Sequence, residues 1–281
     1  MFAVKDDSVS TNTPSANQQQ KMPQLQAAQC ELWFPRLGEC EAIDLRLICF
    51  PFAGGSAASF ASWGAQLPTG VELRALQLPG RSRRMREPAR HRIDELRGDI
   101  LAAITPLLDR PCVLFGHSNG ALLAYDLIHH LSATQRFWVR HFIVSAKPAP
   151  HVKSTLQRQH MNDAELLAEL KRFGGTPPEL LAHEELMALM LPMLRADFGL
   201  SENYGQNAGD RADHSTVLDC PASLWWGNND ECVSEDDVLA WQDYFSKPMQ
   251  RQSFAGGHFY LQQSSQRVLS ALNQILSQHL A

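Results

Sequence analysis

The segment GHSNG (116–120) holds one serine between two glycines, where a strand-like run (112–118) gives way to an amphipathic, helix-like segment (121–131). This spacing fits the G-x-S-x-G pattern, in which a sharp turn exposes the serine hydroxyl above a sheet. We therefore interpret Ser118 as a nucleophile and the backbone amide of Asn119, at the start of the helix, as a donor to an oxyanion. The alternative interpretation is an incidental turn without chemistry.

A serine is a weak nucleophile by itself and needs a base that is held by a third group. After such a turn, the acid and the histidine are expected in that order, each on a loop after a later strand. His258, in GGHFYL (256–261), and Asp230, in GNNDECVS (227–234), meet this order. Asp236 and Asp237 are rivals for the acid, but they look like the first turn of a helix, where carboxylates favour the helix dipole. A bland role for Asp230, as a turn residue that caps the next helix, stays open.

The loop after the first strand is expected to supply a second oxyanion donor. PFAGGS (51–56) has small residues there, so the backbone N–H of Phe52 or Ala53 can face Ser118. Losing one such donor typically costs about 10²–10³ in rate. A glycine-rich loop can also bind phosphate, but this one lacks the spacing and the lysine of a Walker motif, and G-x-G-x-x-G is absent. The sequence therefore argues against a nucleotide site.

These residues need a scaffold in which strands alternate with helices. Strand-like runs cover 45–50, 71–79, 112–118, 140–148, 221–227 and 250–256, and helical spacing is found in 93–108, 121–131 and 265–279. Strands separated by helical crossovers predict an α/β fold, with a mostly parallel sheet and helices on both faces. On this scaffold Ser118, Asp230 and His258 are expected to converge at the mouth of one cavity.

The alternation breaks between about 151 and 215, where the sequence has helical segments but no convincing strand. In one of these segments Met187, Met190 and Met193 recur every third residue. One interpretation is a helical insert buried against its own neighbours. The other is a lid whose inner face meets an acyl chain, because methionine is a pliable lining for varied ligands. Both stay open, since a lid can be both.

The composition is that of a globular protein: 281 residues, 44% hydrophobic and 20% charged, with a formal net charge of −5. This charge gives no general reason to expect nucleic acid or an anionic membrane as a partner. We find no apolar run long enough to span a membrane, no signal-peptide core, and no CxxC pair or metal-like spacing among the six cysteines. We expect a cytoplasmic protein with reduced cysteines and no metal. Residues 1–30 are polar and are expected to form a disordered tail, with one domain over 31–281.

Six motifs together carry a family resemblance: LICFPFAGGSAASFASW (47–63), LPGRSRR (78–84), VLFGHSNGALLAYDL (113–127), GGTPPELL (174–181), LPMLRADF (191–198) and GGHFYL (256–261). They resemble the stand-alone type II thioesterases of nonribosomal peptide and polyketide synthesis, which are similar to the medium-chain acyl thioesterase of fatty acid synthesis. The resemblance extends from about residue 45 to the C-terminus. It implies an α/β-hydrolase fold with a helical lid insert and a catalytic triad of Ser118, Asp230 and His258.

The resemblance also implies the substrates and the role. The substrates would be acyl or aminoacyl groups on the phosphopantetheine arm of an acyl or peptidyl carrier protein, and the enzyme itself would need no cofactor. The family usually removes stalled or wrongly primed groups, and we expect a monomer. One position departs from the family, which commonly has methionine after the nucleophile, where this chain has Asn119. The backbone donor is retained, and a polar side chain beside the acyl path is expected to affect the choice of acyl group.

An arginine cluster, RSRRMR (81–86), stands out on a net-acidic chain. Carrier proteins are generally acidic and bring a phosphate to the tunnel mouth, so Arg81, Arg83 and Arg84 are candidates for carrier docking. The alternative is a solvated loop whose arginines pair with nearby carboxylates. Those carboxylates are Glu72, Glu87 and Asp94.

Three rival functions remain to be weighed against a carrier-dependent thioesterase. The chain could be an esterase or acyl-CoA thioesterase for free small substrates, or a non-catalytic carrier-binding protein. It could also be a cyclising domain cut from the terminus of a synthase. The intact set of Ser118, Asp230, His258 and the AGG loop argues against the non-catalytic alternative, because decay usually removes one member of such a set.

Overall fold

A computed structural model of the chain describes residues 16–205 and 217–280, and its central element is one six-stranded sheet. The strands are β1 (Leu45–Phe50), β2 (Val71–Ala75), β3 (Cys112–His117), β4 (Val139–Ser145), β5 (Ala222–Gly227) and β6 (Gln250–Phe254). Their order is β2-β1-β3-β4-β5-β6, and every neighbouring pair is parallel. The predicted parallel sheet is confirmed; β2 and β4 end earlier than the sequence suggested, at Ala75 and Ser145.

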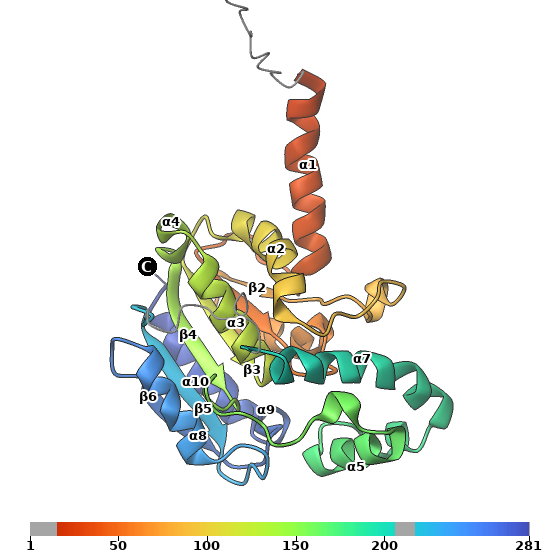
Figure 1. Ribbon diagram of the computed structural model, residues 1–281. Coiled ribbons are helices and arrows are strands. Elements are labelled where there is room, and N and C mark those ends of the chain that lie inside the picture. Colours follow the sequence, from red (N-terminus) through yellow and green to blue (C-terminus); the bar gives the residue numbers. More distant parts are fainter. Residues whose placement is uncertain (1–15, 206–216, 281) are drawn as a thin grey trace, which may run out of the picture.

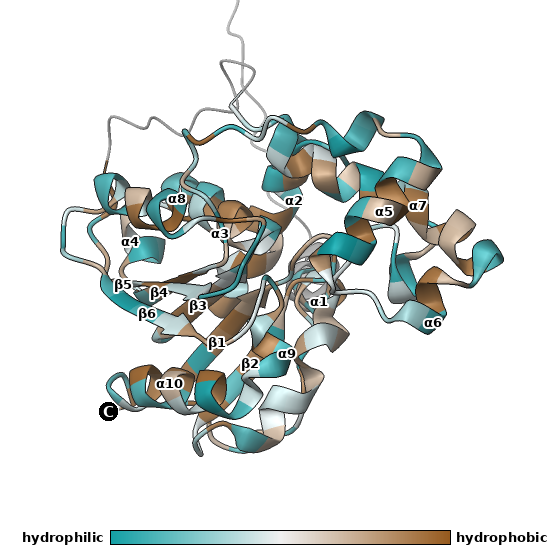
Figure 2. Ribbon diagram, turned by 90° about the horizontal axis from the view of Figure 1, so that it is seen from below, coloured by the Kyte–Doolittle hydropathy of each residue, from teal (hydrophilic) through white to brown (hydrophobic). Residues whose placement is uncertain are grey.

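Helices cover both faces of the sheet. Alternate residues of each strand point to opposite faces, and both sets include apolar side chains that pack against helices. In β1, Ile48 and Phe50 belong to the core formed with α2 (Ile93–Ile104) and α3 (Asn119–His130). Leu47 and Cys49 belong to the second core, formed with α10 (Ser265–Ser277) and the 3-10 segment η1 (Ala57–Gln66). Figure 2 shows α10 on the opposite side of the sheet from α2, α3 and α8 (Glu235–Leu239).

Shorter helices complete the described chain. They are α4 (Ala133–Arg136), α9 (Tyr260–Gln263), η2 (Ser82–Arg84), η3 (Thr105–Leu107) and η5 (Ala240–Tyr244).

The prediction of a disordered tail through residue 30 is wrong from Ala16 onward. Residues Ala16–Trp33 form helix α1, which stands out from the body in Figure 1 and packs against α2 at its C-terminal end. Cys30 and Trp33 are buried there, and the guanidinium carbon of Arg84 lies 3.9 Å from the centre of the Trp33 ring. The polar composition of the segment does not predict these few buried contacts. Residues 1–15 lie outside the described residues.

The insert between β4 and β5 consists of helices in its described part. It contains η4 (Arg158–His160), α5 (Asp163–Phe173), α6 (Pro178–Leu181) and α7 (Glu184–Glu202). In Figure 1 α5 and α7 extend to one side of the sheet, and their apolar residues form a third, separate core. A capping box formed by Asn162 and Glu165 begins α5. Residues 206–215 of the predicted insert lie outside the described residues.

Within residues 16–205 and 217–280, no helix combines the length and the apolar character that crossing a membrane requires. The six cysteines are all free. No group of three or more His, Cys, Asp or Glu side chains in the same part of the chain is placed to hold a metal ion.

Candidate active site

Ser118 sits at a strained turn between β3 and α3. Its φ of +54° lies in the left-handed region, which a residue other than glycine rarely adopts. The turn is tight on both sides: a Cβ on Gly116 would overlap the backbone of Ala121, and one on Gly120 would overlap the carbonyl oxygen of Phe50. The Ser118 amide donates to the carbonyl oxygen of Ser145 in β4 at 2.8 Å, which fixes the turn to the sheet. The packing explains why this spacing needs two glycines.

The structure brings His258 and Asp230 to Ser118. Nε2 of His258 lies 3.1 Å from Oγ of Ser118, and Nδ1 lies 2.8 Å from Oδ2 of Asp230. The other carboxylate oxygen, Oδ1, accepts the backbone N–H of Cys232 at 2.8 Å. The Asp230 side chain is fully buried, and that of His258 is 5% exposed. This geometry suits an imidazole that takes the hydroxyl proton while the carboxylate holds the other ring nitrogen.

Neither rival acid binds His258, although Asp237 lines the same pocket as Ser118. Asp236 and Asp237 belong to the first turn of α8, as the sequence suggested, and the Ser234 hydroxyl caps that helix by accepting the Asp237 amide. Asp230 also has a role in the turn, because it accepts the Cys232 amide, but it does not cap the next helix as the alternative suggested, since Ser234 does so. The two roles of Asp230 are compatible, since its two oxygens have different partners.

The three proposed oxyanion amides are unused. Among the described residues, the backbone N–H groups of Phe52, Ala53 and Asn119 make no hydrogen bond. In contrast, the Gly54 amide donates to Oδ2 of Asp197 at 2.7 Å and the Gly55 amide donates to the Phe52 carbonyl at 2.9 Å. Free donors on a fixed turn beside Ser118 are what an oxyanion needs.

Comparison with known proteins gives the family. The model of the thioesterase domain family matches residues 45–276. The chain belongs to the thioesterase family. The gramicidin S biosynthesis protein GrsT of Aneurinibacillus migulanus is 30% identical over 243 residues, which are 86% of this chain and 93% of that protein.

Two solved structures agree with this assignment. The type II thioesterase BorB, from the borrelidin biosynthetic cluster, is 31% identical, with a TM-score of 0.76 over 89% of this chain and 98% of that one. YbtT, a type II thioesterase of the yersiniabactin pathway, is 32% identical, with a TM-score of 0.76 over 88% and 98%. The expected α/β-hydrolase fold and the identification as a serine thioesterase are confirmed.

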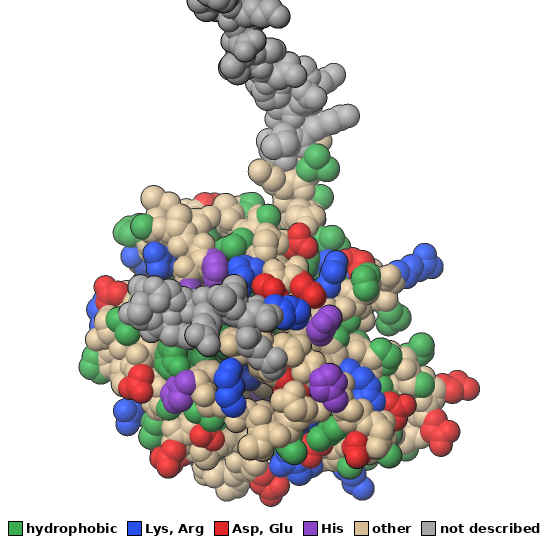
Figure 3. All heavy atoms as spheres, viewed as in Figure 1, with side chains coloured by type: hydrophobic (Ala, Val, Ile, Leu, Met, Phe, Trp, Pro, Cys, Tyr) green, Lys and Arg blue, Asp and Glu red, His purple; other side chains and the backbone are tan. Residues whose placement is uncertain are grey.

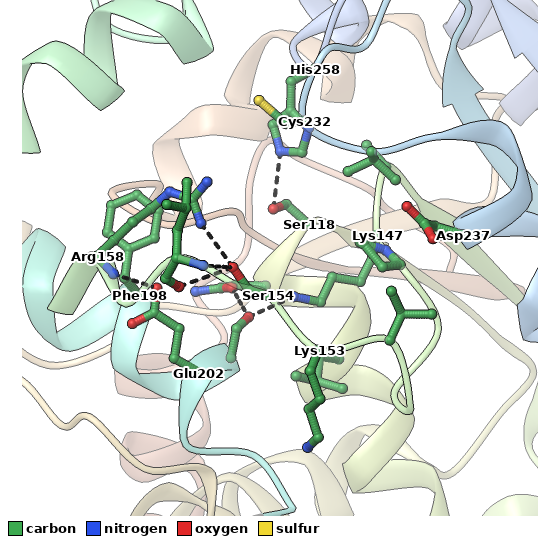
Figure 4. A pocket seen from close by; sticks show the side chains of 18 of the residues that line it. Ser118, Lys147, Lys153, Ser154, Arg158, Phe198, Glu202, Cys232, Asp237 and His258 are labelled. Carbon is green, nitrogen blue, oxygen red and sulfur yellow. Dashed lines mark hydrogen bonds between the residues drawn. The ribbon is translucent and has the colours of Figure 1, made fainter.

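Two pockets of the thioesterase meet at the serine. One has a cavity volume of about 610 Å³ and the other about 290 Å³. The two pockets share five lining residues: Ser118, Asn119, Phe173, Phe198 and His258. The larger pocket has many charged side chains, and Figure 4 shows Lys147, Arg158 and Glu202 around it with Ser118 and His258. The smaller pocket lies over the 52–55 loop and is lined mainly by apolar groups of that loop and of α5 and α7.

The three methionines predicted to line the acyl path do not all face a pocket. Met190 lines the smaller pocket beside Leu194, as the lid interpretation requires. Met187 and Met193 line neither pocket; they are 2% and 8% exposed and belong to the core of the insert itself. The lid-lining prediction is therefore wrong for these two residues, which fit the alternative of an insert buried against its own neighbours.

The docking prediction is wrong for Arg81 and Arg84, because both guanidinium groups are buried and paired inside the protein. Arg81 binds both oxygens of Asp197, at 2.7 and 2.6 Å. Arg84 binds both oxygens of Glu87, at 2.8 and 2.6 Å, which is one of the pairings suggested by the sequence. Arg83 is exposed and donates to the carbonyl oxygen of Glu31. On the face in Figure 3, acidic and basic side chains are interspersed, with no extended patch of one sign.

Two titratable side chains near Ser118, Cys232 and His117, are both uncharged at neutral pH. Burial raises the pKa of the Cys232 thiol to about 11, so this pocket residue is protonated at neutral pH. Burial, reinforced by the nearby His258, holds the pKa of His117 well below its usual value, so that ring is neutral beneath the site. Nδ1 of His117 lies 2.7 Å from Oγ of Ser145, which itself lies 2.5 Å from the Tyr260 hydroxyl. No sequence pattern predicted this buried chain of contacts.

Proposed function

We propose that this thioesterase hydrolyses acyl or aminoacyl thioesters on the phosphopantetheine arm of carrier proteins in a peptide or polyketide pathway. The observation that carries the proposal is the meeting of two pockets at one serine, 3.1 Å from a histidine: the larger pocket has several charged lining residues and the smaller one has no Asp, Glu, Lys or Arg. A thioester of this kind has an acyl side and an amide-rich arm, and it places its carbonyl carbon between them. The names of the relatives, which belong to peptide and polyketide biosynthesis, support the same class of substrate.

In the proposed reaction His258 takes the proton of Ser118 while Oγ attacks the thioester carbon. The oxyanion is held by the backbone amide of Asn119 and by that of Phe52 or Ala53. The C–S bond then breaks, and the sulfur leaves as a thiol with the proton from His258. Water, deprotonated by His258, attacks the acyl ester, and the ester C–O bond breaks as Ser118 regains its proton. The products are the free acid and the carrier thiol.

Asp230 has a supporting role in this proposal. Its Oδ2 accepts from Nδ1 of His258, which keeps Nε2 free to face Ser118 and stabilises the imidazolium once it forms. All bonds are made and broken by side chains and water, so the proposed reaction needs no cofactor beyond the arm of the substrate. The proposed role is the removal of stalled or wrongly primed groups, carried out by a monomer that meets many carriers in turn.

The two pockets are assigned by polarity. We place the acyl group in the smaller pocket, where Met190 and Leu194 offer apolar contacts. The arm takes the larger pocket, whose charged and polar side chains match its amides and hydroxyl. The arginine cluster is not part of this assignment, since Arg81 and Arg84 are buried.

The decisive experiment is a panel of carrier proteins loaded with different acyl and aminoacyl groups, with release scored by intact mass. Acyl-CoA and simple esters of matched chain length are run beside it. We expect turnover of loaded carriers by the wild type, none by Ser118→Ala, and weaker turnover of the free substrates. Equal or faster turnover of simple esters would favour the esterase alternative, and binding of carriers without turnover would favour a non-catalytic role.

A further inference from the structure

The insert helix α7 contacts the 52–55 loop through a buried carboxylate. Oδ2 of Asp197 accepts the backbone N–H of Gly54 at 2.7 Å, and both of its oxygens accept from the guanidinium of Arg81, at 2.7 and 2.6 Å. The side chains of Arg81 and Asp197 are 6% and 2% exposed. Nη1 of Arg81 also donates to the carbonyl oxygen of Gly55 at 2.9 Å. The Asp197 carboxylate thus binds the loop directly at Gly54 and, through Arg81, at Gly55.

The same turn of α7 contacts the other side of the oxyanion site. Nδ2 of Asn119 donates to the backbone carbonyl oxygen of Asp197 at 2.5 Å, and the Ser201 hydroxyl donates to Oδ1 of Asn119. Asn119 is the residue directly after the nucleophile, and its own amide faces the site. Both candidate halves of the oxyanion hole are therefore bonded to residues one helical turn apart on α7.

Without these bonds the 52–55 loop would be free to move its amides. Gly54 has a φ of +78°, and a Cβ there would lie 2.7 Å from Cδ2 of Leu194 on α7. The Gly54 N–H belongs to the peptide group that joins Ala53 to Gly54. A fixed direction of this N–H therefore fixes the peptide group directly after the Ala53 donor. Glycine adopts many conformations when it is free. A fixed hydrogen-bond partner is therefore needed if the donors are to be preorganised for the oxyanion.

We propose that Asp197 is a positioning residue for the oxyanion hole, so that α7 holds the loop donor and the Asn119 donor at a fixed separation. The proposal rests on the thioesterase mechanism above and adds an element to it: the insert supplies a part of the catalytic geometry as well as a wall of the acyl pocket. Asp197 touches neither the substrate nor the reacting atoms. It acts through the Gly54 amide and through its own carbonyl oxygen.

The competing explanation is that Arg81 and Asp197 form a buried ion pair that serves only stability. Removing one partner of such a pair is strongly destabilising, because it leaves a buried charge without a partner. Asp197→Asn alone could therefore lower activity by unfolding the protein. The double variant Arg81→Met/Asp197→Leu removes both charges, and such replacements are often neutral for stability. It also removes the acceptor of the Gly54 N–H.

The experiment compares Asp197→Asn and the double variant with Asp126→Asn. Asp126 is a matched control, because its side chain is also 2% exposed, both of its oxygens accept from the guanidinium of Arg97, at 2.8 and 2.9 Å, and it lines neither pocket. Steady-state hydrolysis of an acyl-pantetheine is measured for each protein, together with its thermal unfolding. The affinity for an acyl trifluoromethyl ketone is measured as well. Ser118 Oγ adds to the ketone carbon, His258 takes the proton, and the resulting oxyanion occupies the hole.

We expect kcat of both Asp197 variants to fall by about 10–100-fold, less than the loss of a whole donor, with KM changed by less than about threefold. The affinity for the ketone should fall by the same factor as kcat. Asp126→Asn should lose stability and keep kcat. The proposal is overturned if the folded double variant keeps wild-type kcat, if its ketone affinity is unchanged, or if Asp126→Asn loses as much kcat. Absence of turnover in the wild type would overturn the proposed function instead.

Discussion

Lys147 places a partly buried amine in the larger pocket, and its pKa leads to a prediction that depends on pH. It follows β4 and lines the larger pocket, and its Nζ donates to Oγ of Ser201 at 2.6 Å. Figure 4 shows the side chain extending below Ser118. Burial lowers its pKa from 10.5 to about 8; Arg158 acts in the same direction, and Glu202 opposes both. No carboxylate of the described residues lies within ion-pair distance of Nζ.

The magnitude follows from the displaced pKa of Lys147. One pKa unit corresponds to about 1.4 kcal/mol, so a move of the pKa from 10.5 to about 8 costs the charged folded state at most about 3.5 kcal/mol. The folded state binds fewer protons than the unfolded state between these two values, so the stability of the wild type rises with pH in that window. The cost is complete below pH 8 and absent above pH 10.5.

Lys147→Met is therefore expected to stabilise the fold at neutral pH. The variant escapes the cost of the buried charge and loses one hydrogen bond worth about 1 kcal/mol, so we expect a net gain of about 1–2 kcal/mol at pH 7. This gain should shrink as the pH rises from 8 towards 10.5. Urea unfolding at pH 7, 8, 9 and 10 measures the difference from the wild type at each pH, and ionisations common to both proteins cancel.

Lys247→Met is the control, because Lys247 is 54% exposed and pairs with Asp219 at the surface. It removes one positive charge without changing the pocket. A constant difference between Lys147→Met and the wild type from pH 7 to 10 would refute the account. So would a variant that is less stable than the wild type at pH 7 and more stable at pH 10.

Three further predictions follow from the site. Asp230→Asn should lower kcat about 10³–10⁴-fold with little change in KM, because the imidazole loses the acceptor that fixes its tautomer; a loss confined to KM in steady-state assays would contradict this. Gly120→Ala should reduce the melting temperature and the soluble yield, since its Cβ would overlap the Phe50 carbonyl oxygen; unchanged thermal unfolding would show that the turn has room. Met190→Trp should fill the smaller pocket and lower release of long acyl groups at least tenfold relative to short ones, measured by intact mass of loaded carriers. Equal losses at all chain lengths would place the acyl group elsewhere.

The sheet and the grouping of Ser118, Asp230 and His258 were predictable because they depend on local patterns and on order. Short apolar runs separated by helical segments predicted the parallel sheet, and parallel strands bring their carboxyl ends to one edge. A serine, an acid and a histidine that follow three such strands must then lie near each other. The prediction needed no knowledge of side-chain packing, which explains why it worked here.

Predictions failed where distant residues pair. Arg81 looked exposed because its neighbours are charged, yet its partner Asp197 is 116 residues away and buries it. The prediction that three methionines line one pocket failed for a geometric reason. Residues three apart on a helix with 3.6 residues per turn drift around the axis by about 60° at each step, so Met187, Met190 and Met193 cannot all face one pocket.

The role of Asn119 depends both on a local sequence pattern and on bonds to residues far away in the chain. The sequence identifies it as a departure beside the nucleophile, and it suggested that a polar side chain there would face the acyl path. In the structure its amide nitrogen donates to the Asp197 carbonyl and its amide oxygen accepts from Ser201, so both polar atoms are used by α7. A methionine has neither a donor nor a strong acceptor and could not make these bonds. The side chain of Asn119 therefore ties the nucleophile turn to the insert.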